Sequence, residues 1–409
     1  MDCKFFRSVV AFWFAPPRTP PLWQRGFFLV NCFVLRSLLA SERSGVVKTF
    51  RWQTMSSSFN DDSRIVGCIL GTAVGDALGL PYEGVSRRRL LRLLGPPERH
   101  RFLFGRGMIS DDTEHTCLVA QSLIAAGSDV EAFTYQLGGR LRWWFASLPA
   151  GLGRATLRSC LKLWFGVPPN RSGVFSAGNG PAMRSAIFGA CVDDIDTMAE
   201  YVRASARVTH SDPKAEYGAM AVALATHMGC RIDNVNGESY LEQLDALIGS
   251  DGAELIALLR PVVASVSAGE STLDFAMSNG FEHGVSGYTY HTVPIVIHAW
   301  LLNPRDFHAS VSSVIQCGGD ADTTAAIVGG IVGAATGESG IPDNWLSRIF
   351  EWPRSVNWMR ELSAQLVRSR NDLVPTKPMS TNFLASLIRN LGFLVVVLFH
   401  GFRRLFPPY

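Results

Sequence analysis

Between residues 65 and 80, a glycine recurs at every fourth position: Gly67, Gly71, Gly75 and Gly79. In a helix, this spacing places all four on one stripe with almost no side chain. Each glycine inside a helix costs about 1 kcal/mol relative to alanine, so a packing partner has to offset the loss. A membrane helix with small residues at this spacing is the competing interpretation, but Asp76 and the short length of the segment oppose it. We therefore expect a buried helix that another segment approaches closely.

The remainder of the body, as far as Leu366, has the periodicity of helices and no convincing alternation of the strand type. Asp212 before Pro213 and Asn303 before Pro304 are typical helix starts. The sequence predicts a compact all-α domain without a fixed-period repeat. The segments expected to be helical are 65–80, 114–126, 181–190, 195–206, 213–228, 240–248, 252–266, 291–301, 304–315, 322–335 and 356–368.

Charge and cysteine usage exclude several classes of protein. The net charge of +3 is unevenly distributed, because residues 1–54 carry +6 and residues 376–409 carry +4. The body between them is therefore acidic, at −7, and has no basic footprint for nucleic acid. The eight cysteines are scattered without a Cys-x-x-Cys pair, so a zinc ribbon is not expected. Reduced, buried cysteines are the expected state, which favours a cytoplasmic location.

Composition divides the chain into three parts. Residues 1–54 form a basic extension whose apolar runs are interrupted by prolines and are too short to span a membrane. Two interpretations stay open for this extension: a targeting segment, or a start assigned upstream of a natural start at Met55. Residues 55–375 are the helical domain, and residues 376–409 are a linker followed by an apolar and basic C-terminal helix.

The C-terminal helix is expected within FLASLIRNLGFLVVVLFHGF, residues 383–402. Its strictly apolar part, residues 391–399, is too short to span a membrane alone. One interpretation is membrane association, with the helix in the bilayer interface or acting as a marginal tail anchor. The alternative is a last helix that packs on the domain or on a partner chain.

The carboxylates of the body gather in three short patches, GDALGLPYEG, ISDDTEHT and QCGGDADTT. Adjacent acids followed by a hydroxyl suit hard divalent cations, which prefer oxygen ligands. Gly318 and Gly319 allow a tight turn, so that Asp320 and Asp322 converge at the N-terminus of the next helix. Ordinary helix capping is the alternative for each patch alone, but three patches together favour a metal site.

Two further segments carry groups suited to a phosphate-bearing ligand. SAGNGPAMRSA, residues 176–186, is a loop that runs into a helix predicted to begin near Pro181. Gly178 and Gly180 allow backbone amides to approach an anion, and a helix N-terminus favours phosphate. VTHSDP places His210 just before the next helix. A plain loop and a capping histidine are the alternatives.

In this order, the motifs resemble the ADP-ribosylglycohydrolase family. The resemblance covers residues 64–337 and rests on GCILGTAVGDALGLPYEG, SDDT, GNGPAMR, VTHSDPKAEYGA and GGDADTTAAIVGGIVGA. It implies an all-α orthogonal bundle with two Mg²⁺ (or Mn²⁺) ions in a central cleft. Members hydrolyse the bond between the anomeric carbon of ADP-ribose and an acceptor. An ADP-ribosylated protein or an ADP-ribose derivative is therefore the implied partner.

The resemblance also implies a role for each matched residue. Asp112 or Asp320 would take a proton from water, and Glu83 would lie near the metals. Ser110 replaces a threonine often found first in its motif, and either hydroxyl can bind a metal. The implied metal ligands are Ser110, Asp111, Asp112, Asp320, Asp322 and Thr323. The residues implied to line the ADP-ribose pocket are Gly178, Asn179, Gly180, Met183 and His210.

Alternatives to this enzyme remain open. One is a hydrolase of the same fold that acts on another nucleotide or on acetylated ADP-ribose. Another is a non-catalytic ADP-ribose-binding or structural relative, whose mark would be the loss of metal ligands. The aromatic stretch 141–169, with Trp143, Trp144, Trp164 and Phe165, either covers the cleft and selects the acceptor or belongs to the core.

Overall fold

A computed structural model describes residues 61–102, 104–403 and 406, and every structural statement below concerns this part of the chain. Within it the secondary structure is helical, with five isolated β-bridges and no strand. The predicted all-α fold is therefore confirmed. The division proposed at residues 54 and 55 lies outside the described residues and stays a prediction.

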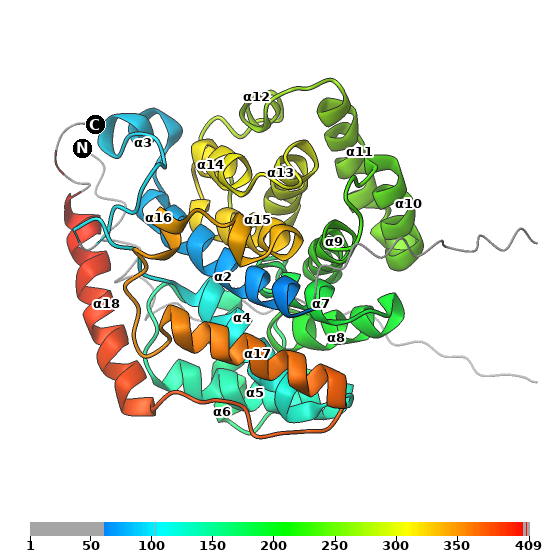
Figure 1. Ribbon diagram of the computed structural model, residues 1–409, viewed down its shortest axis with the longest axis vertical. Helices are drawn as coiled ribbons and strands as arrows, with labels where there is room; N and C mark the ends of the chain where they lie inside the picture. Colours follow the sequence, from blue (N-terminus) through cyan, green and yellow to red (C-terminus); the bar gives the residue numbers. More distant parts are fainter. Residues whose placement is uncertain (1–60, 103, 404–405, 407–409) are drawn as a thin grey trace, which may run out of the picture. The chain divides into compact units, whose positions relative to one another are not determined.

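The helices are connected by short loops and 3-10 turns (Figure 1). The first half contains α2 (Asp61–Gly79), η1 (Leu80–Tyr82), α3 (Arg87–Leu93), α4 (Asp111–Ala126), α5 (Val130–Ala146), α6 (Arg154–Trp164), η2 (Pro169–Arg171), η3 (Ala182–Arg184), α7 (Ala186–Cys191), α8 (Ile195–Thr209) and α9 (Pro213–Gly229). The second half contains α10 (Gly237–Ile248), η4 (Ser250–Gly252), α11 (Ala253–Ser267), α12 (Thr272–Ser278), α13 (Thr289–Leu302), α14 (Phe307–Cys317), α15 (Ala321–Thr336), η5 (Glu338–Gly340), α16 (Asp343–Leu346), α17 (Val356–Asp372) and α18 (Phe383–Arg403).

The glycine stripe of α2 packs directly against α15, and the two helices lie side by side in Figure 1. A methyl group added to Gly71 would lie 2.2 Å from the carbonyl oxygen of Gly329, and one added to Gly75 would lie 2.0 Å from that of Ala325. Backbone therefore packs on backbone, as the sequence predicted. Beyond α2 and η1, the backbone amide of Gly84 donates to the carbonyl of Gly319 at 2.7 Å. This contact brings the segment that carries Glu83 beside the start of α15.

Two predicted helix starts have different outcomes. Asp212 caps α9, because its side chain accepts a hydrogen bond from the amide of Lys214. The start predicted at Asn303 is wrong, since α14 begins at Phe307 behind Asp306, whose carboxylate accepts from the amide of Ala309. An acid with a free amide three residues ahead forms the better cap. Helices α3, α5, α6, α12 and α16 were not predicted.

The continuous helix predicted from Pro181 to Ala190 is also wrong. The structure has the 3-10 turn η3 followed by the six-residue α7. Side chains occupy the carbonyls that would otherwise continue a helix: Arg184 Nη1 donates to the carbonyl of Gly180 at 3.1 Å, and Ser185 Oγ donates to that of Pro181 at 2.7 Å. The long helix dipole expected to face the loop at residues 178–180 is therefore absent.

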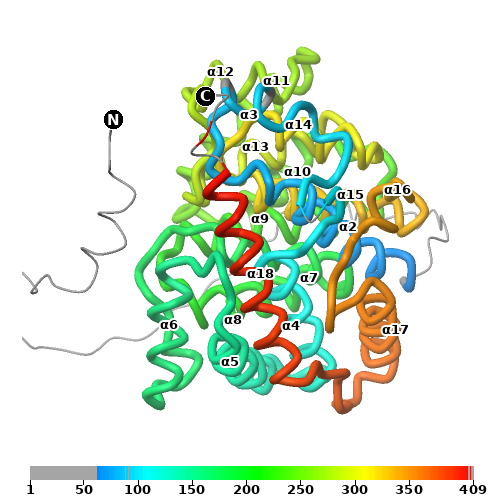
Figure 2. Tube along the Cα trace, turned by 90° about the vertical axis from the view of Figure 1, so that its left-hand side faces the viewer, coloured from blue at the N-terminus to red at the C-terminus, as the bar shows by residue number. Residues whose placement is uncertain are grey.

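Helices α2 and α18 are each long and apolar enough to cross a membrane by length and composition, but they differ in burial. The apolar window of α2 is 94% buried, as in a core helix, whereas that of α18 is 22% buried. Figure 2 shows α18 in red on the face turned towards the viewer. The predicted C-terminal helix is therefore present, and one side of it packs on the domain.

Candidate active site

A cleft of about 370 Å³ collects the predicted site residues from distant parts of the sequence. All of them line it except Asp112, which is buried just behind Ser110. The lining residues that sequence analysis named are Glu83, Ser110, Asp111, Gly178, Asn179, Gly180, Met183, His210, Asp320, Asp322 and Thr323.

Asp76, from α2, holds the start of the second acidic patch. Its Oδ2 accepts hydrogen bonds from the amide of Ser110 at 2.8 Å and from the amide of Thr113 at 3.2 Å. Burial raises the pKa of Asp76 to about 6, although the hydrogen bonds from Thr113 and Ser110 lower it. Ser110 is the N-cap of α4, and its hydroxyl donates to Asp112 Oδ2 at 3.0 Å. The folded chain therefore fixes this patch before any ligand binds.

The third acidic patch begins α15 and contacts the second. Gly318 and Gly319 have φ values of +74° and +82°, so the predicted tight turn before Asp320 is confirmed. Asp320 is the N-cap of α15, and Asp322 lies in the first helical turn. Thr323 Oγ1 lies 3.4 Å from Asp112 Oδ2. Two acidic segments separated by more than two hundred residues therefore meet at one end of the cleft.

The glycine loop joins the same site through Asn179. Its side-chain Nδ2 donates to Asp320 Oδ2 at 2.6 Å and to Thr292 Oγ1 at 3.0 Å. The ring of His210 lies against the loop, since a methyl group added to Gly180 would lie 2.9 Å from its Cε1. Burial first, and then the charge of Arg184, lower the pKa of His210 to about 3. His210 therefore offers a neutral ring to a ligand.

Arg184 is fully buried and supports this loop from the protein interior. Its guanidinium donates to the carbonyl of Gly180 at 3.1 Å, to Thr209 Oγ1 at 2.7 Å and to the carbonyl of Ser205 at 2.9 Å. Thr209 Oγ1 in turn lies 2.9 Å from His210 Nδ1. One buried arginine therefore fixes both the loop and the histidine.

Buried negative groups crowd the acidic end of the cleft. Burial first, and then the neighbouring carboxylates, raise the pKa values of Asp111, Asp112 and Asp322 well above the ordinary value. One oxygen of Asp76, one of Asp112 and one of Asp322 are buried without a hydrogen-bond partner. Unpaired buried carboxylate oxygens are costly unless a proton or a cation compensates them.

Comparison with known proteins identifies the family. The sequence profile described as ADP-ribosylglycohydrolase matches residues 57–373. The chain belongs to the ADP-ribosylglycohydrolase family. The ADP-ribosyl-[dinitrogen reductase] glycohydrolase of Rhodospirillum rubrum is 28% identical, with 70% of this chain and 90% of that protein covered. ADP-ribosylhydrolase ARH3 of Gallus gallus is 26% identical, with 76% and 96% covered. A solved ADP-ribosylglycohydrolase-related protein complex matches at a TM-score of 0.52 and 27% identity, over 76% of this chain and 99% of that one.

These relatives confirm the predicted class of enzyme, an ADP-ribosylglycohydrolase-type hydrolase. The oxygen donors in and behind the cleft fit a hard divalent cation in type, because one carboxylate oxygen each of Asp322 in its lining and of Asp76 and Asp112 behind it lacks a partner, and the hydroxyls of Ser110 and Thr323 line the cleft. In the described part of the chain, however, no three His, Cys, Asp or Glu side chains converge as metal ligands do. Two bound ions therefore remain a prediction.

Two residues that support the cleft without lining it, and several that do line it, were not assigned by the sequence analysis. Asp76 and Arg184 were read only as members of motifs, because their roles depend on hydrogen bonds across the fold. The aromatic residues of 141–169 do not line the cleft: Trp144 is buried in the core, while Trp143 and Trp164 are exposed. The same stretch contributes Ala150, Gly151, Gly153, Arg154, Ala155 and Thr156 instead. Phe393 and Val397 of α18 also line it, outside the residues that the family profile matches.

Proposed function

We propose that this chain hydrolyses, in a metal-dependent reaction, the glycosidic bond between ADP-ribose and an acceptor on a protein or a small molecule. The observation that carries the proposal is the contact between Asn179 and Asp320, which unites the glycine loop with the acidic patches in one cleft. A ligand with a nucleotide part and a ribose hydroxyl part matches these two halves.

The cation, Mg²⁺ or Mn²⁺, would bind ribose hydroxyls and acidify a water molecule. The chain supplies the oxygen donors for it from two acidic patches and their neighbouring hydroxyls. The proposed ligands are Ser110, Asp111, Asp112, Asp320, Asp322 and Thr323.

Two carboxylates are proposed to accept the proton of the attacking water. Asp112 has one oxygen held by Ser110 and one buried oxygen without a partner, which is free to accept a proton. Asp320 has one oxygen oriented by Asn179. Glu83 lines the same cleft and adds negative charge near the ribose, where an oxocarbenium-like transition state would develop positive charge.

The other half of the cleft is proposed to bind ADP-ribose. Gly178 and Gly180 leave space beside the backbone that His210 partly fills. Because the imidazole stays neutral, His210 and Met183 would contact the ligand through shape and hydrogen bonding rather than charge. The proposal includes no nucleic-acid partner, in keeping with the acidic body of the chain.

The test uses the full chain with arginine- and serine-ADP-ribosylated peptides and with O-acetyl-ADP-ribose. We expect ADP-ribose release with Mg²⁺ that stops with EDTA and falls at least about 100-fold in Asp320→Asn, because a catalytic carboxylate is lost. Asp343→Asn is the matched control, since Asp343 is exposed and does not line the cleft. Release in EDTA would contradict the metal dependence. ADP-ribose binding without release of any substrate would favour a non-catalytic relative.

We also propose that the enzyme associates with anionic membranes through the outer face of α18. The two sides of the helix have an unusual distribution of side chains, because Ser386 and Asn390 are buried while most of its large apolar side chains, Phe393 excepted, are exposed. A helix that faces water has the opposite arrangement. The exposed apolar residues of α18 are Phe383, Leu384, Ile388, Leu391, Leu394, Val395, Leu398, Phe399 and Phe402.

Charge favours a lipid surface as the occupant of this face. No acid follows Asp372 in the sequence, while Lys377 precedes the helix and Arg403 is its last residue. A helix of 21 residues is about 31 Å long. Because its inner side is hydrogen-bonded to the domain, α18 would lie in the membrane plane rather than span it. A cytoplasmic location remains our prediction, and the six described cysteines, all free and buried, support it.

Sedimentation with vesicles tests this proposal. We expect the full chain to bind phosphatidylcholine vesicles that contain phosphatidylserine and to lose binding in Leu398→Glu. Leu258→Glu, on the exposed side of α11, is the matched control and should bind as wild type. A stable dimer in lipid-free light scattering that Leu398→Glu dissociates would assign the face to a second copy and contradict the proposal.

A further inference from the structure

The inner side of α18 forms part of the cleft wall. Phe393 is 2% exposed and packs with Leu80, Phe102 and Met108. Phe393 and Val397 both line the cleft that holds the acidic patches. A segment outside the family-matched residues therefore adds an apolar surface to the site.

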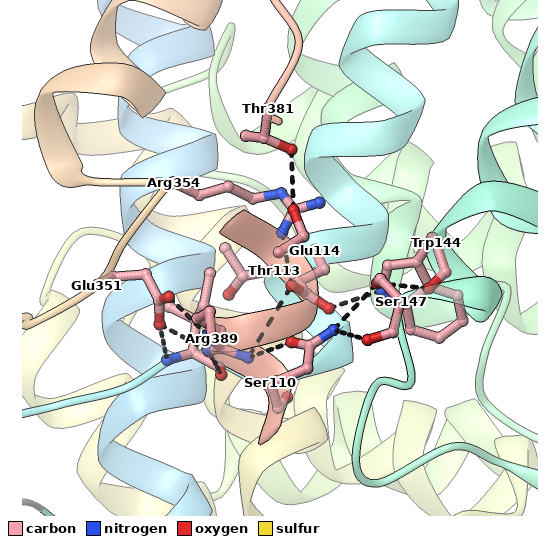
Figure 3. A network of polar contacts seen from close by, with 12 residues as sticks. Ser110, Thr113, Glu114, Trp144, Ser147, Glu351, Arg354, Thr381 and Arg389 are labelled. Atoms are coloured by element: carbon pink, nitrogen blue, oxygen red, sulfur yellow. Dashed lines mark hydrogen bonds and ion pairs between the residues drawn. The ribbon is translucent and has the colours of Figure 1, made fainter. Parts of the chain in front are cut away.

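Arg389 fixes α18 to the backbone that leads into the acidic patch (Figure 3). Its guanidinium makes a bidentate ion pair with Glu351, at 2.7 and 2.6 Å, and donates to the carbonyl of Ile109 at 2.6 Å. Glu351 in turn accepts a hydrogen bond from the amide of Ile109 at 3.2 Å. The ion pair thus holds both sides of the residue immediately before Ser110. Its side chains are only 5% and 2% exposed, so solvent screens it little.

The same helix reaches two other parts of the site. Arg389 Nη1 lies 3.9 Å from Oε1 of Glu114, a buried residue in the first turn of α4 that also accepts from Arg354 and Trp144. Asn390 Nδ2 donates to the carbonyl of Ser147 at 2.9 Å, at the start of the loop that lines the cleft from Ala150 onward. Figure 3 shows Arg389 between Glu351 and Ser147, with Glu114 beside it. α18 is therefore attached to the acidic segment and to the neighbouring loop at once.

We propose that α18 contributes to substrate recognition and to the positioning of the acidic patch in the active site. Phe393 and Val397 form the wall that contacts the acceptor part of the substrate, and Arg389 is a positioning residue that holds the backbone of Ser110, Asp111 and Asp112. The inference rests on the proposed function. The ADP-ribose half of the substrate is assigned to segments inside the family-matched region. The acceptor half is therefore the part of the substrate that the apolar wall of α18 would contact. Such a wall discriminates acceptors by the length of the apolar stem beside the scissile bond.

The wall is tested by a matched pair on one helix. Val397 lines the cleft, whereas Val395, two residues earlier, is 66% exposed. We expect Val397→Ala to change the ratio of kcat/KM between arginine-linked and serine-linked substrates at least about threefold. One methylene in a fully apolar pocket changes discrimination about tenfold or more, and Val397 forms only part of this wall. The Kd for ADP-ribose should stay within about twofold, because binding of that half does not involve α18. Val395→Ala should change neither quantity. The same ratio of kcat/KM in the wild type, Val397→Ala and Val395→Ala would overturn the proposal that this wall contacts the acceptor.

The positioning role is tested by metal binding, which does not depend on turnover. Arg389→Met leaves Glu351 buried without its partner and is prone to misfold, so the double variant Arg389→Met/Glu351→Met removes both charges together. We expect the folded double variant to bind Mn²⁺ about tenfold more weakly by calorimetry and to lose kcat with an unchanged KM. Arg389→Lys should recover part of both losses. Wild-type Mn²⁺ affinity in the double variant would overturn the role. If no substrate is cleaved by the wild type, the proposed function fails while this titration still decides the inference about Arg389.

Discussion

Asn179 Nδ2 lies 2.6 Å from Oδ2 of Asp320 and joins two loops that are 141 residues apart in the sequence. The backbone N–H of Asn179 also donates to the carbonyl of Gly287 at 3.0 Å. Both the side chain and the backbone of Asn179 therefore hold the loop in place. Asn179 thereby orients the carboxylate of Asp320, which we propose as an acceptor for the proton of water.

Asn179→Asp tests this orientation at constant side-chain size. The change replaces a donor with a carboxylate that repels Asp320, so kcat/KM should fall about tenfold or more while the protein stays folded. Steady-state kinetics and thermal unfolding measure the two effects. Asn279→Asp, at an exposed position outside the cleft, is the control and should leave kcat/KM unchanged. Full activity in Asn179→Asp would show that the contact does not orient the carboxylate.

The close packing of α2 on α15 predicts an extreme response to one methyl group. Gly75→Ala places Cβ 2.0 Å from the carbonyl oxygen of Ala325, so backbone has to move. The free energy of unfolding should fall by about 3 kcal/mol or more, or the chain should fail to fold. Gly139→Ala in α5 meets nothing within 4 Å and should instead raise stability by up to about 1 kcal/mol. Similar stabilities for both variants, measured by urea unfolding, would contradict this packing.

Local signals in the sequence were sufficient to predict the glycine stripe, the three acidic patches and the glycine loop. Each of these features is encoded by residues that are close together in the sequence. The turn at Gly318 and Gly319 is an example, since only the adjacent residues determine it. Arg184 was not assignable, because its partners come from Ser205 and Thr209 through the folding of α8. The burial of Arg389 could not be predicted from the sequence either. An apolar helix normally packs by its apolar face, whereas α18 buries Ser386, Arg389 and Asn390 beside Phe393 and leaves most of its large apolar side chains exposed.

Divalent cations should stabilise the folded chain. The buried oxygens of Asp112 and Asp322 have no hydrogen-bond partner in the metal-free site, and a cation would compensate them. Mn²⁺ at one hundred times its Kd should therefore add about 3 kcal/mol at pH 7. Asp322→Asn should raise the stability of the metal-free protein, because it removes a carboxyl group that burial and neighbouring carboxylates disfavour in its charged form, and should reduce the stabilisation by Mn²⁺. Thermal unfolding with EDTA or Mn²⁺ measures both effects, with Asp343→Asn as the control. An unchanged response to Mn²⁺ in Asp322→Asn would exclude this residue as a ligand.

His298 predicts a loss of stability in mild acid. Its ring is fully buried, lies 3.0 Å by Nε2 from Ser265 Oγ and 3.1 Å by Nδ1 from Thr272 Oγ1, and stacks on Phe275. Burial lowers its pKa to about 4, although the charge of Glu270 raises it.

The unfolded chain, with an ordinary histidine pKa of about 6.5, binds the proton of His298 first as the pH falls. The stability that His298 contributes is therefore complete above about pH 6.5 and is lost progressively between pH 6.5 and pH 4. Between pH 7 and pH 5 the loss should be about 2 kcal/mol. His298→Gln keeps a hydrogen-bonding side chain but removes the titrating group. In urea unfolding, the loss of stability between pH 7 and pH 5 should therefore be about 2 kcal/mol smaller in this variant than in the wild type. His283→Gln, at an exposed position, should behave as wild type. An equal acid loss in wild type and His298→Gln would show that other groups set the pH dependence of stability.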